Sequence, residues 1–320
     1  MYSDIRKQLK TVDITCYDSQ ISVFSDRLGL RNLKKGTLQN YISCLKIFLA
    51  WCVMFLSSKG AEHISYDDFR SFVHFLNQEH LEPRTINVYI ATLKQFRYLI
   101  QGEAWNRYEL RFMKYELKLP RVPSVEEAGS MIKNCLCCVE RLLLLLLFST
   151  GLRISEAAAL TFGDIRRDKH LIYIRPGKGR SDRYVPLLDD VLSALTDYYQ
   201  EIARACYNAG ISRPGPCDPI FRFSDYLRPA NSNFLRRIYN NVVNRTFGAK
   251  GVYTPHSCRH FFALQIYLQK GDLLLVKELL GHRSLGATEV YLRLAAAQKL
   301  ESDGYVNPLL LCLGIQNNGN

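Results

Sequence analysis

The stretch Leu119-Pro120-Arg121-Val122-Pro123-Ser124 divides the chain, because its two prolines interrupt any helix that approaches from either side. Ser124 is a good helix N-cap, and Glu126 and Glu127 follow it at positions where acidic side chains favour the first turn of a helix. The 320 residues also exceed what a single core usually holds. The sequence therefore predicts two domains, over 1–118 and 125–320, joined by a linker over 119–124.

The composition is that of a soluble globular chain with a basic excess. Apolar residues make up 48% and charged residues 22% of the sequence. Lysine and arginine outnumber aspartate and glutamate by 42 − 30 = 12, with 17 − 12 = 5 in residues 1–120 and 25 − 18 = 7 after them. This even distribution predicts a polyanion held along the whole chain and excludes a single basic tail.

We expect the chain to work in the cytoplasm, away from membranes. The N-terminus lacks the apolar stretch of a secretory signal, and the most apolar run, Leu142–Phe148, is far shorter than the ~20 residues of a membrane helix. Ten cysteines are too dilute for a disulfide scaffold in a chain of this length. Cys135, Cys137 and Cys138 cluster without the second Cys or His pair of a zinc site, so no metal is predicted.

The first domain is predicted to be almost entirely helical. Apolar residues recur about every 3.6 positions over 37–56, 66–76 and 85–99. Three basic side chains in the region of the last segment are expected to contact phosphates, although a solvated helix surface fits each of them equally well. These side chains are Arg84, Lys94 and Arg97.

The second domain is predicted to be mainly helical with one β-hairpin. Its two strands are the alternating runs Leu171–Arg175 and Arg183–Leu187, on either side of a turn that contains Pro-Gly-Lys-Gly. The run Leu142–Phe148 is expected to form a buried core helix. The predicted fold class is mainly α, with a helical N-terminal domain and an α-rich second domain that contains a small antiparallel β-hairpin.

Two segments early in the second domain place charged groups at unusual positions. Gly151 breaks the leucine-rich helix, Arg153 begins the next helix, and Glu156 lies on the same helix face, where it would fix the guanidinium for contact with a phosphate. A surface Arg–Glu pair is the alternative. Lys178 stands between two glycines at the predicted hairpin tip, where its ammonium could give a proton to a leaving oxygen or serve solubility alone.

Two later segments add further reactive groups. Thr254 caps a helix that begins at Pro255 and ends at Gly271, so His256 and Arg259 share its first turn, where an anion is favoured. A short helix over 272–280 closes at Gly281 and is followed by His282. Thr288 is expected to cap a last helix with Tyr291 in its first turn. Taken singly, these residues also fit a capped core helix and a packing tyrosine.

The order and spacing of these motifs closely resemble the tyrosine recombinase (phage integrase) family over roughly 124–298. The preceding helical domain is similar to that family's core-binding (SAM-like) domain in architecture. The resemblance implies that Tyr291 is the nucleophile, with Glu156 as a supporting acidic residue. It also implies five assisting residues: Arg153, Lys178, His256, Arg259 and His282. Cys258 departs from the family pattern, in which leucine is more usual before the motif arginine.

The resemblance implies a site-specific integrase or recombinase that cleaves double-stranded DNA through a 3′-phosphotyrosine link and rejoins it. In this hypothesis His256 accepts the phenol proton, Lys178 protonates the leaving 5′ oxygen, and Arg153, Arg259 and His282 stabilise the phosphorane. No nucleotide cofactor or metal is predicted, because the sequence has no Gly-rich phosphate loop and no carboxylate cluster for magnesium.

Assembly and the exact reaction stay open at this point. The resemblance implies a homo-tetramer on two DNA sites, and the apolar run Leu309–Leu313 near the C-terminus could dock on a neighbouring subunit or fold back on its own domain. A type IB topoisomerase would use the same covalent link without strand exchange. A catalytically idle DNA-binding regulator would keep only the binding surface. Neither the target DNA sequence nor the choice among integrase, resolvase, invertase and transposon recombinase can be inferred from these residues.

Overall fold

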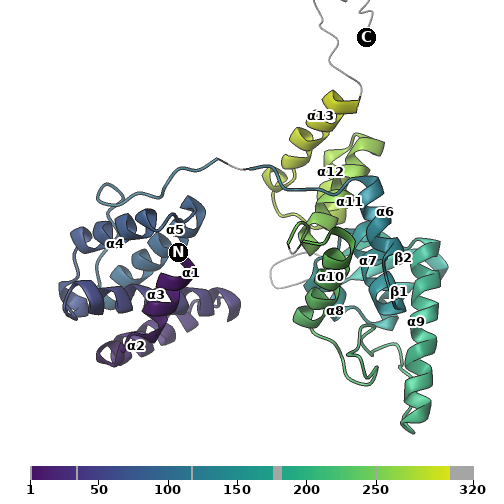
Figure 1. Ribbon diagram of the computed structural model, residues 1–320, viewed down its shortest axis with the longest axis horizontal. Coiled ribbons are helices and arrows are strands. Elements are labelled where there is room, and N and C mark those ends of the chain that lie inside the picture. The colour runs from purple at the N-terminus through teal and green to yellow at the C-terminus, as the bar shows by residue number, and fades with distance from the viewer. Residues whose placement is uncertain (1, 34, 117, 176–181, 250, 303–320) are drawn as a thin grey trace, which may run out of the picture. The chain divides into compact units, whose positions relative to one another are not determined.

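The computed structural model describes residues 2–33, 35–116, 118–175, 182–249 and 251–302. The chain divides into two compact units, Met1–Leu117 and Lys118–Asn320. Each is mainly helical (Figure 1). Each also has its own hydrophobic core. The predicted fold class is therefore confirmed.

Helices make up the N-terminal unit. Its α-helices are α1 (Tyr2–Thr11), α2 (Asp18–Gly29), α3 (Lys35–Phe55), α4 (Tyr66–Gln78) and α5 (Pro83–Phe96), with short helical turns η1 (Thr15–Tyr17), η2 (Ala61–His63) and η3 (Arg97–Gln101). The three periodic segments of the sequence correspond to α3, α4 and α5. Phe48 of α3 lies at the centre of the core, with the rings of Phe69, Phe72 and Phe96 between 5.0 and 5.8 Å from its own.

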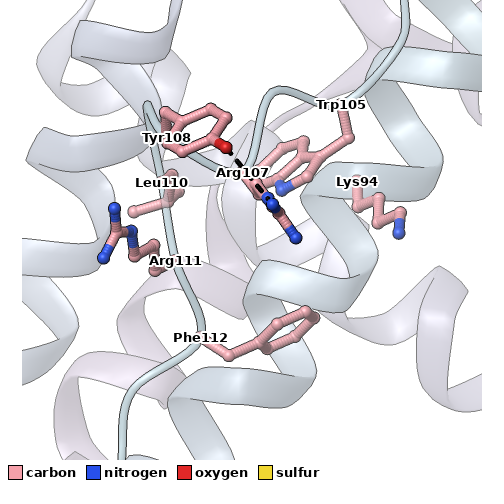
Figure 2. A pocket seen from close by; sticks show the side chains of 7 residues that line it. All are labelled: Lys94, Trp105, Arg107, Tyr108, Leu110, Arg111 and Phe112. Atoms are coloured by element: carbon pink, nitrogen blue, oxygen red, sulfur yellow. Dashed lines mark hydrogen bonds between the residues drawn. The ribbon is translucent and has the colours of Figure 1, made fainter.

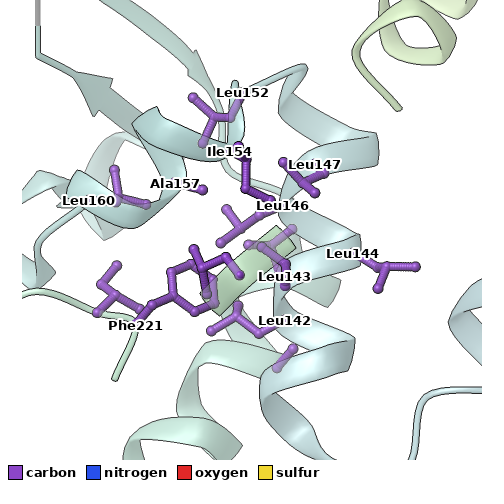
Figure 3. Close-up of a cluster of buried hydrophobic side chains, with 14 of the residues drawn as sticks. Leu142, Leu143, Leu144, Leu146, Leu147, Leu152, Ile154, Ala157, Leu160 and Phe221 are labelled. Atoms are coloured by element: carbon purple, nitrogen blue, oxygen red, sulfur yellow. The ribbon is translucent and has the colours of Figure 1, made fainter. Parts of the chain in front are cut away.

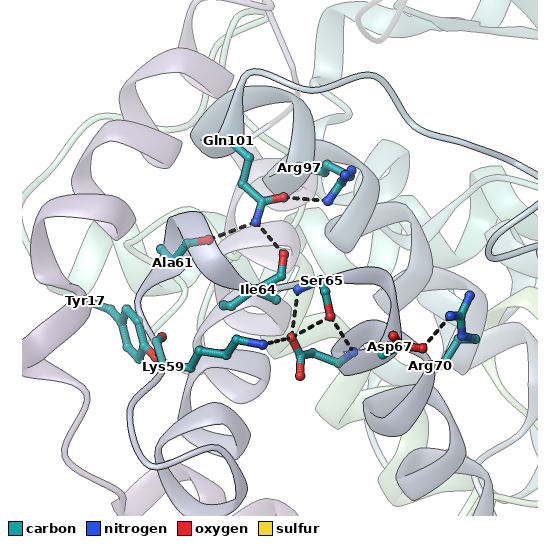
Figure 4. Close-up of polar contacts among 10 residues, drawn as sticks. Tyr17, Lys59, Ala61, Ile64, Ser65, Asp67, Arg70, Arg97 and Gln101 are labelled. Atoms are coloured by element: carbon teal, nitrogen blue, oxygen red, sulfur yellow. Dashed lines mark hydrogen bonds and ion pairs between the residues drawn. The ribbon is translucent and has the colours of Figure 1, made fainter.

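Side-chain contacts fix the helix ends of this unit (Figure 4). Ser65 caps α4 through a capping box with Asp68, whose carboxylate also receives Lys59 at 2.7 Å. Gln101 donates to the carbonyl oxygens of Ala61 and Ile64, at 2.9 and 2.7 Å. These contacts tie η2 to the end of η3, so the unit is closed by specific hydrogen bonds as well as by its core.

Helix α3 is long and apolar enough, by length and composition alone, to cross a membrane. Its apolar character is not concentrated in one run such as Leu142–Phe148, so the sequence did not predict it as a helix of membrane length. In the structure, α3 packs against α1, α2 and α5. It contributes most of the residues from Cys44 to Cys52 to the core, with Lys46 of the same stretch exposed.

The C-terminal unit is built around one buried helix. Leucines on every side of α7 (Cys138–Thr150) are buried, among them Leu142, Leu144 and Leu147 (Figure 3). Helix α7 contacts five other helices and β3. The helices of this unit are α6 (Val125–Lys133), α7, α8 (Ile154–Ala159), α9 (Asp189–Asn208), α10 (Ser232–Phe247), α11 (Pro255–Lys270), α12 (Leu273–Leu280) and α13 (Val290–Ser302), with short turns η4 (Phe162–Asp164), η5 (Arg167–Lys169) and η6 (Leu285–Ala287).

A three-stranded antiparallel sheet lies beside these helices, in the order β1 (Ile165–Arg166), β2 (Leu171–Ile174) and β3 (Arg183–Pro186). Strands β2 and β3 form the predicted hairpin, with Ile172 paired to Val185. The sequence did not reveal β1, because two residues are too short to show alternation. The sheet brings the start of β3 next to α12, with which it is in contact.

The helix boundaries that position the later motifs agree with the sequence. Ser124 and Glu127 form a capping box at α6, and Thr254 and Ser257 form one at α11. Helices α11 and α12 both end at a glycine in the left-handed conformation, Gly271 and Gly281. Glycine has no Cβ to resist that conformation, so both helices stop where the sequence predicts.

Candidate active site

Glu156 is held between two arginines from different elements. The main-chain N–H and Nη1 of Arg153 both donate to its carboxylate at 2.9 Å, which confirms the predicted i, i+3 pair. From β3, Nη2 of Arg183 reaches the same carboxylate at 2.8 Å. Arg183 also donates from Nε to the carbonyl oxygen of Leu279 at 2.7 Å. One carboxylate therefore connects the start of α8 to the sheet, and Arg183 carries that connection on to α12.

The electrostatics of this triad favour the ionised carboxylate. Burial of Glu156 raises its pKa, but the hydrogen bonds and charges of Arg183 and Arg153 outweigh burial and bring the pKa to about 2. Two guanidinium groups share a single negative charge, so the cluster keeps a net positive charge. An oriented, partly buried cation of this kind suits recognition of phosphate oxygens.

Arg259 is buried deeper and is held by the main chain. Its side chain projects from the first turn of α11, and the residue is 3% exposed. Nη1 donates to the carbonyl oxygen of Gly151 at 2.7 Å, and Nη2 donates to that of Leu280. Both oxygens lie at the C-terminal ends of helices, where the helix dipole favours a cation. Burial, and then the charge of Arg153, lowers the pKa of Arg259 to about 9, so it is charged at neutral pH.

Gly151 is required for this arrangement. Its φ is +62°, and a Cβ there would lie 2.5 Å from Cδ1 of Phe262 and 3.0 Å from Cδ2 of Leu280. Both the left-handed conformation and the close approach favour glycine. The break after α7 thus turns the Gly151 carbonyl toward Arg259 and the following Arg153 toward Glu156.

The hydroxyl of Tyr291 faces a histidine of α11. Tyr291 lies in the first turn of α13, as predicted, and is 1% exposed. Its ring packs with Phe262, Val276 and Leu280, and its oxygen is 3.1 Å from Nδ1 of His260. The phenol therefore has an apolar surround on its ring and a polar contact at its oxygen.

The pKa values of this pair keep the proton on the phenol. Burial raises the pKa of Tyr291 to about 12, although the charges of Arg259 and Arg153 favour the phenolate. Burial, with His256 and Arg259 nearby, lowers the pKa of His260 to about 4. At neutral pH both groups are uncharged, and the contact is a hydrogen bond between neutral partners.

The two predicted histidines occupy different surroundings. His256, in the first turn of α11, is more exposed than Arg259, and partial burial together with Arg259 and Arg153 lowers its pKa. Nδ1 of His282 is 2.9 Å from the hydroxyl of Thr288. The side chain of Thr288, expected as a helix cap, therefore contacts His282 and is buried.

Cys258, the departure from the family pattern, is fully buried. Its Sγ donates to the hydroxyl of Tyr239 at 3.6 Å. It belongs to the core behind Arg259 and so concerns packing more than chemistry. Lys178 and the apolar run Leu309–Leu313 lie outside the described residues.

The three basic residues predicted on α5 and just after it differ from one another. Arg84 and Lys94 are exposed. Arg97 is only 13% exposed at its side chain and pairs with Glu103. Its guanidinium also lies 4.3 Å from the ring centre of Tyr66 and donates to Gln101 at 3.0 Å. Arg97 thus stabilises its own unit, and only Arg84 and Lys94 present a charge outward.

Sequence reasoning missed the ion pair of Arg183, the contact of Thr288 with His282 and the contact made by His260. His260 directly follows Arg259 in the sequence, but nothing in its spacing shows that it contacts a tyrosine 31 positions later. Arg183 and Glu156 are 27 positions apart. Among the residues that the structure describes, no three His, Cys, Asp or Glu side chains gather in a metal-binding group.

Two family models match this chain. The family model described as "Phage integrase family" matches residues 124–298, and that of the "Phage integrase, N-terminal SAM-like domain" matches 21–107. The chain belongs to the tyrosine recombinase (phage integrase) family. It is therefore an enzyme of the class that breaks and rejoins DNA strands.

Two relatives show how far the similarity extends. The tyrosine recombinase XerC of Oceanobacillus iheyensis is 32% identical over 285 residues, which cover 85% of this chain and 90% of the relative. The tyrosine recombinase XerA of Pyrococcus furiosus is 27% identical over 296 residues, which cover 91% and 95%. Both similarities span the two units.

Solved structures share the fold at lower identity. The XerH site-specific recombinase bound to its difH substrate in a pre-cleavage complex has a TM-score of 0.61 and 22% identity, over 83% of this chain and 80% of that one. A lambda integrase tetramer bound to a Holliday junction has a TM-score of 0.65 and 19% identity, over 85% and 76%. These likenesses support the fold of both units.

Proposed function

We propose that the chain is a site-specific DNA recombinase that cleaves and rejoins strands through a 3′-phosphotyrosine at Tyr291. The observation that carries the proposal is the position of the Tyr291 hydroxyl. It lies in a hydrogen bond to α11 and within reach of the charges of Arg259 and Arg153, which favour its phenolate. A tyrosine placed only for packing has no need of two fixed cations.

The proposed step exchanges one phosphate ester for another. The phenol oxygen of Tyr291 bonds to phosphorus while the bond from phosphorus to the 5′ oxygen breaks. The phenol proton passes to a base, and the 5′ oxygen takes up a proton, which we assign to Lys178. Attack by the 5′-hydroxyl of a partner strand then reverses both bond changes. Because the covalent link preserves the ester, the reaction needs no nucleotide cofactor.

The cations are assigned to the added negative charge of the phosphorane. Arg153 and Arg259 are already oriented by Glu156 and by main-chain oxygens, so little reorganisation is needed when a phosphate arrives. His282, steadied by Thr288, is the third donor. By analogy with oxyanion holes, each such donor contributes roughly 10²–10³ in rate.

The contact between Tyr291 and His260 is a resting arrangement in this proposal. A phenol with a pKa near 12 does not ionise beside a histidine with a pKa near 4, so attack is suppressed until DNA binds. We assign the later acceptance of the proton to His256, which is more exposed than His260 and lies in the same first turn of α11 as Arg259.

We propose double-stranded recombination sites as the substrate and a homo-tetramer on DNA as the working assembly. Exchange between two duplexes involves four cleavages, and each protomer supplies one tyrosine. The fold shared with a lambda integrase tetramer on a Holliday junction supports this assembly. The bacterial and archaeal relatives support action in the cytoplasm, where their DNA lies.

A nicked suicide substrate tests the proposal. The recombination site is first selected from random duplexes by binding to the full chain. A nick is then placed next to the scissile phosphate, so that cleavage releases the short fragment that carries the new 5′-hydroxyl. We expect the wild-type chain to form a covalent adduct and Tyr291→Phe to form none. Tyr305→Phe, a change in the same part of the chain, is the matched control and should keep the adduct.

Three other outcomes contradict the proposal. An adduct that survives Tyr291→Phe would move the nucleophile elsewhere. An adduct accompanied by relaxation of any supercoiled plasmid, with no recombinant, would indicate a type IB topoisomerase. Tight binding without any adduct would indicate an idle regulator.

A further inference from the structure

We propose that the N-terminal unit holds an unpaired stretch of DNA in an aromatic and basic pocket beside α5. The pocket has a volume of about 520 Å³, within the roughly 300–1,000 Å³ of ligand sites. Lys94 of α5 lines it on one side, and the segment after η3 supplies the rest (Figure 2). The residues from that segment are Trp105, Arg107, Tyr108, Leu110, Arg111 and Phe112. We call these six residues and Lys94 the aromatic–basic pocket.

The cations of the pocket are free to bind an anion. Lys94, Arg107 and Arg111 line it, and no carboxylate among the described residues forms an ion pair with any of them. The nearby Glu109 forms an ion pair with Arg70 at 2.7 Å, and Glu103 forms one with Arg97. Three uncompensated cations in one hollow favour a polyanion, with a binding constant that falls as salt rises.

The aromatic side chains distinguish the ligand further. Tyr108 is 71% exposed and Phe112 is 51% exposed, so both side chains are accessible from solvent. Trp105 is half-buried and is fixed from behind, with its ring centre 5.4 Å from that of Tyr66 and 6.0 Å from that of Phe69. In a duplex the base faces are already stacked on each other. Only unpaired bases can stack on these rings.

Two arginines of the pocket, Arg107 and Arg111, lie beside the ring of Tyr108 in an arrangement that suits an unpaired nucleotide. The guanidinium groups of Arg107 and Arg111 lie 5.2 and 5.9 Å from the ring centre of Tyr108, and Arg107 also donates to its hydroxyl at 3.2 Å. A planar guanidinium held in this way offers one face to a base and its N–H groups to a phosphate. The arrangement therefore matches both parts of a nucleotide.

A second hollow extends the pocket along α5. It has a volume of about 220 Å³ and shares Lys94 and Trp105 with the first. Its other lining residues include Arg31 and Tyr98, whose guanidinium and ring centre are 5.1 Å apart. Repetition of the Arg–Tyr pairing in two hollows that share Lys94 and Trp105 suits successive nucleotides of one strand more than a single small anion.

The inference rests on the proposed function for its biological setting. Cleavage frees a strand with a 5′-hydroxyl, and that strand must unpair from its complement before it joins a partner. A protein that carries out the exchange therefore meets unpaired bases. The binding itself needs no cleavage, so it can be measured in the Tyr291→Phe background whether or not Tyr291 is the nucleophile.

Fluorescence of the full chain provides the first measurement. Trp105 and the buried Trp51 are the two tryptophans. We expect an oligo(dT) probe of about 15 nucleotides to quench the Tyr291→Phe protein, and the same protein with Trp105→Phe to show no quenching. Quenching that persists without Trp105, or its absence in both proteins, would overturn the proposal.

Affinities of the exposed variants provide the second measurement. Tyr108→Ala with Phe112→Ala should lower the affinity for labelled oligo(dT) at least about fivefold and leave the affinity for a duplex of equal length unchanged. Tyr207→Ala removes a ring that is 83% exposed on α9 and should change neither affinity. Equal losses of affinity for both probes would indicate a surface that contacts only phosphates. No loss of affinity for oligo(dT) would show that the pocket does not bind unpaired bases. Either result overturns the proposal.

Discussion

The cations of the candidate active site and those of the aromatic–basic pocket are held in opposite ways. Arg259 is 3% exposed and donates to two helix-terminal carbonyl oxygens, while Arg153 and Arg183 share the single carboxylate of Glu156. In the N-terminal unit, Lys94 is exposed and has no carboxylate partner among the described residues.

The difference separates chemistry from binding. A buried cation held by several partners has one position, which is what stabilising a charged transition state requires. An exposed cation adapts to whatever backbone arrives and contributes mainly affinity and its salt dependence. The comparison therefore predicts large, specific effects for changes in the first group and small, salt-dependent effects for changes in the second.

The largest effect is expected from loss of the shared carboxylate. Glu156→Ala leaves Arg153 and Arg183 without their counter-charge in a partly buried site, so we expect a loss of about 3–5 kcal/mol in the stability of the C-terminal unit. Hydrogen exchange of the α7 amides measures this stability. Asp67→Ala breaks an exposed pair with Arg70 and should cost at most about 1 kcal/mol. Equal costs for the two variants would contradict the comparison.

The same carboxylate predicts an acid dependence with a definite sign. The pKa of Glu156 is about 2 in the folded chain and 4.5 for the free side chain. Its stabilising contribution is therefore complete above pH 4.5 and is lost as the pH falls toward 2. Over that window we expect the wild type to lose about 3 kcal/mol more than Glu156→Gln. Parallel acid titrations of the two proteins would refute the assignment.

A change at Arg259 should act on rate. Arg259→Lys keeps a positive charge but loses the planar fork that reaches both Gly151 and Leu280. We expect adduct formation to slow by roughly 10²–10³ with little change in DNA affinity. Single-turnover trapping at saturating DNA separates the two quantities. A variant that binds weakly but cleaves at the normal rate would place Arg259 among the binding residues.

Gly151→Ala should have an intermediate effect. The new Cβ would meet Phe262 at 2.5 Å, and the residue would keep a φ of +62°. We expect a cost of about 1–3 kcal/mol in stability. Gly248 has a similar φ of +65° with nothing within 4 Å, so Gly248→Ala tests the strain alone and should cost less. Equal costs would show that the contact with Phe262 is unimportant.

The smallest effects are expected on the N-terminal unit. Lys94→Ala should weaken DNA binding modestly and reduce the slope of log affinity against log salt by about 1. Arg97→Ala should leave that slope unchanged and lower the stability of the unit, since Arg97 is occupied by Glu103, Gln101 and Tyr66. Salt titrations by fluorescence anisotropy distinguish these outcomes. The same slope change in both variants would contradict the different roles of the two residues.

The sequence predicts the local parts of this structure well. Caps at Ser124 and Thr254, helix ends at Gly271 and Gly281, and the Arg153–Glu156 pair all depend on residues a few positions apart. Such signals are physical properties of short segments, so they can be seen without the fold.

What the sequence could not predict depends on contacts between distant segments. The ion pair of Arg183 with Glu156 and the contact of His260 with Tyr291 join residues 27 and 31 positions apart. Arg97 lies on a basic, amphipathic stretch. Only the folded unit shows that its guanidinium contacts the ring of Tyr66 and pairs with Glu103. Spacing identifies a helix face, whereas the folded neighbours decide what that face contacts.

Mass spectrometry of the trapped adduct tests the central claim most directly. Trypsin should release Ser284–Arg293, a peptide with a single tyrosine, Tyr291. If the cations of Arg153 and Arg259 organise a phosphate for attack by this phenol, the peptide will carry the 3′-phosphate and its nucleotides at Tyr291. A nucleotide found on any other tyrosine, with Ser284–Arg293 unmodified, would contradict it.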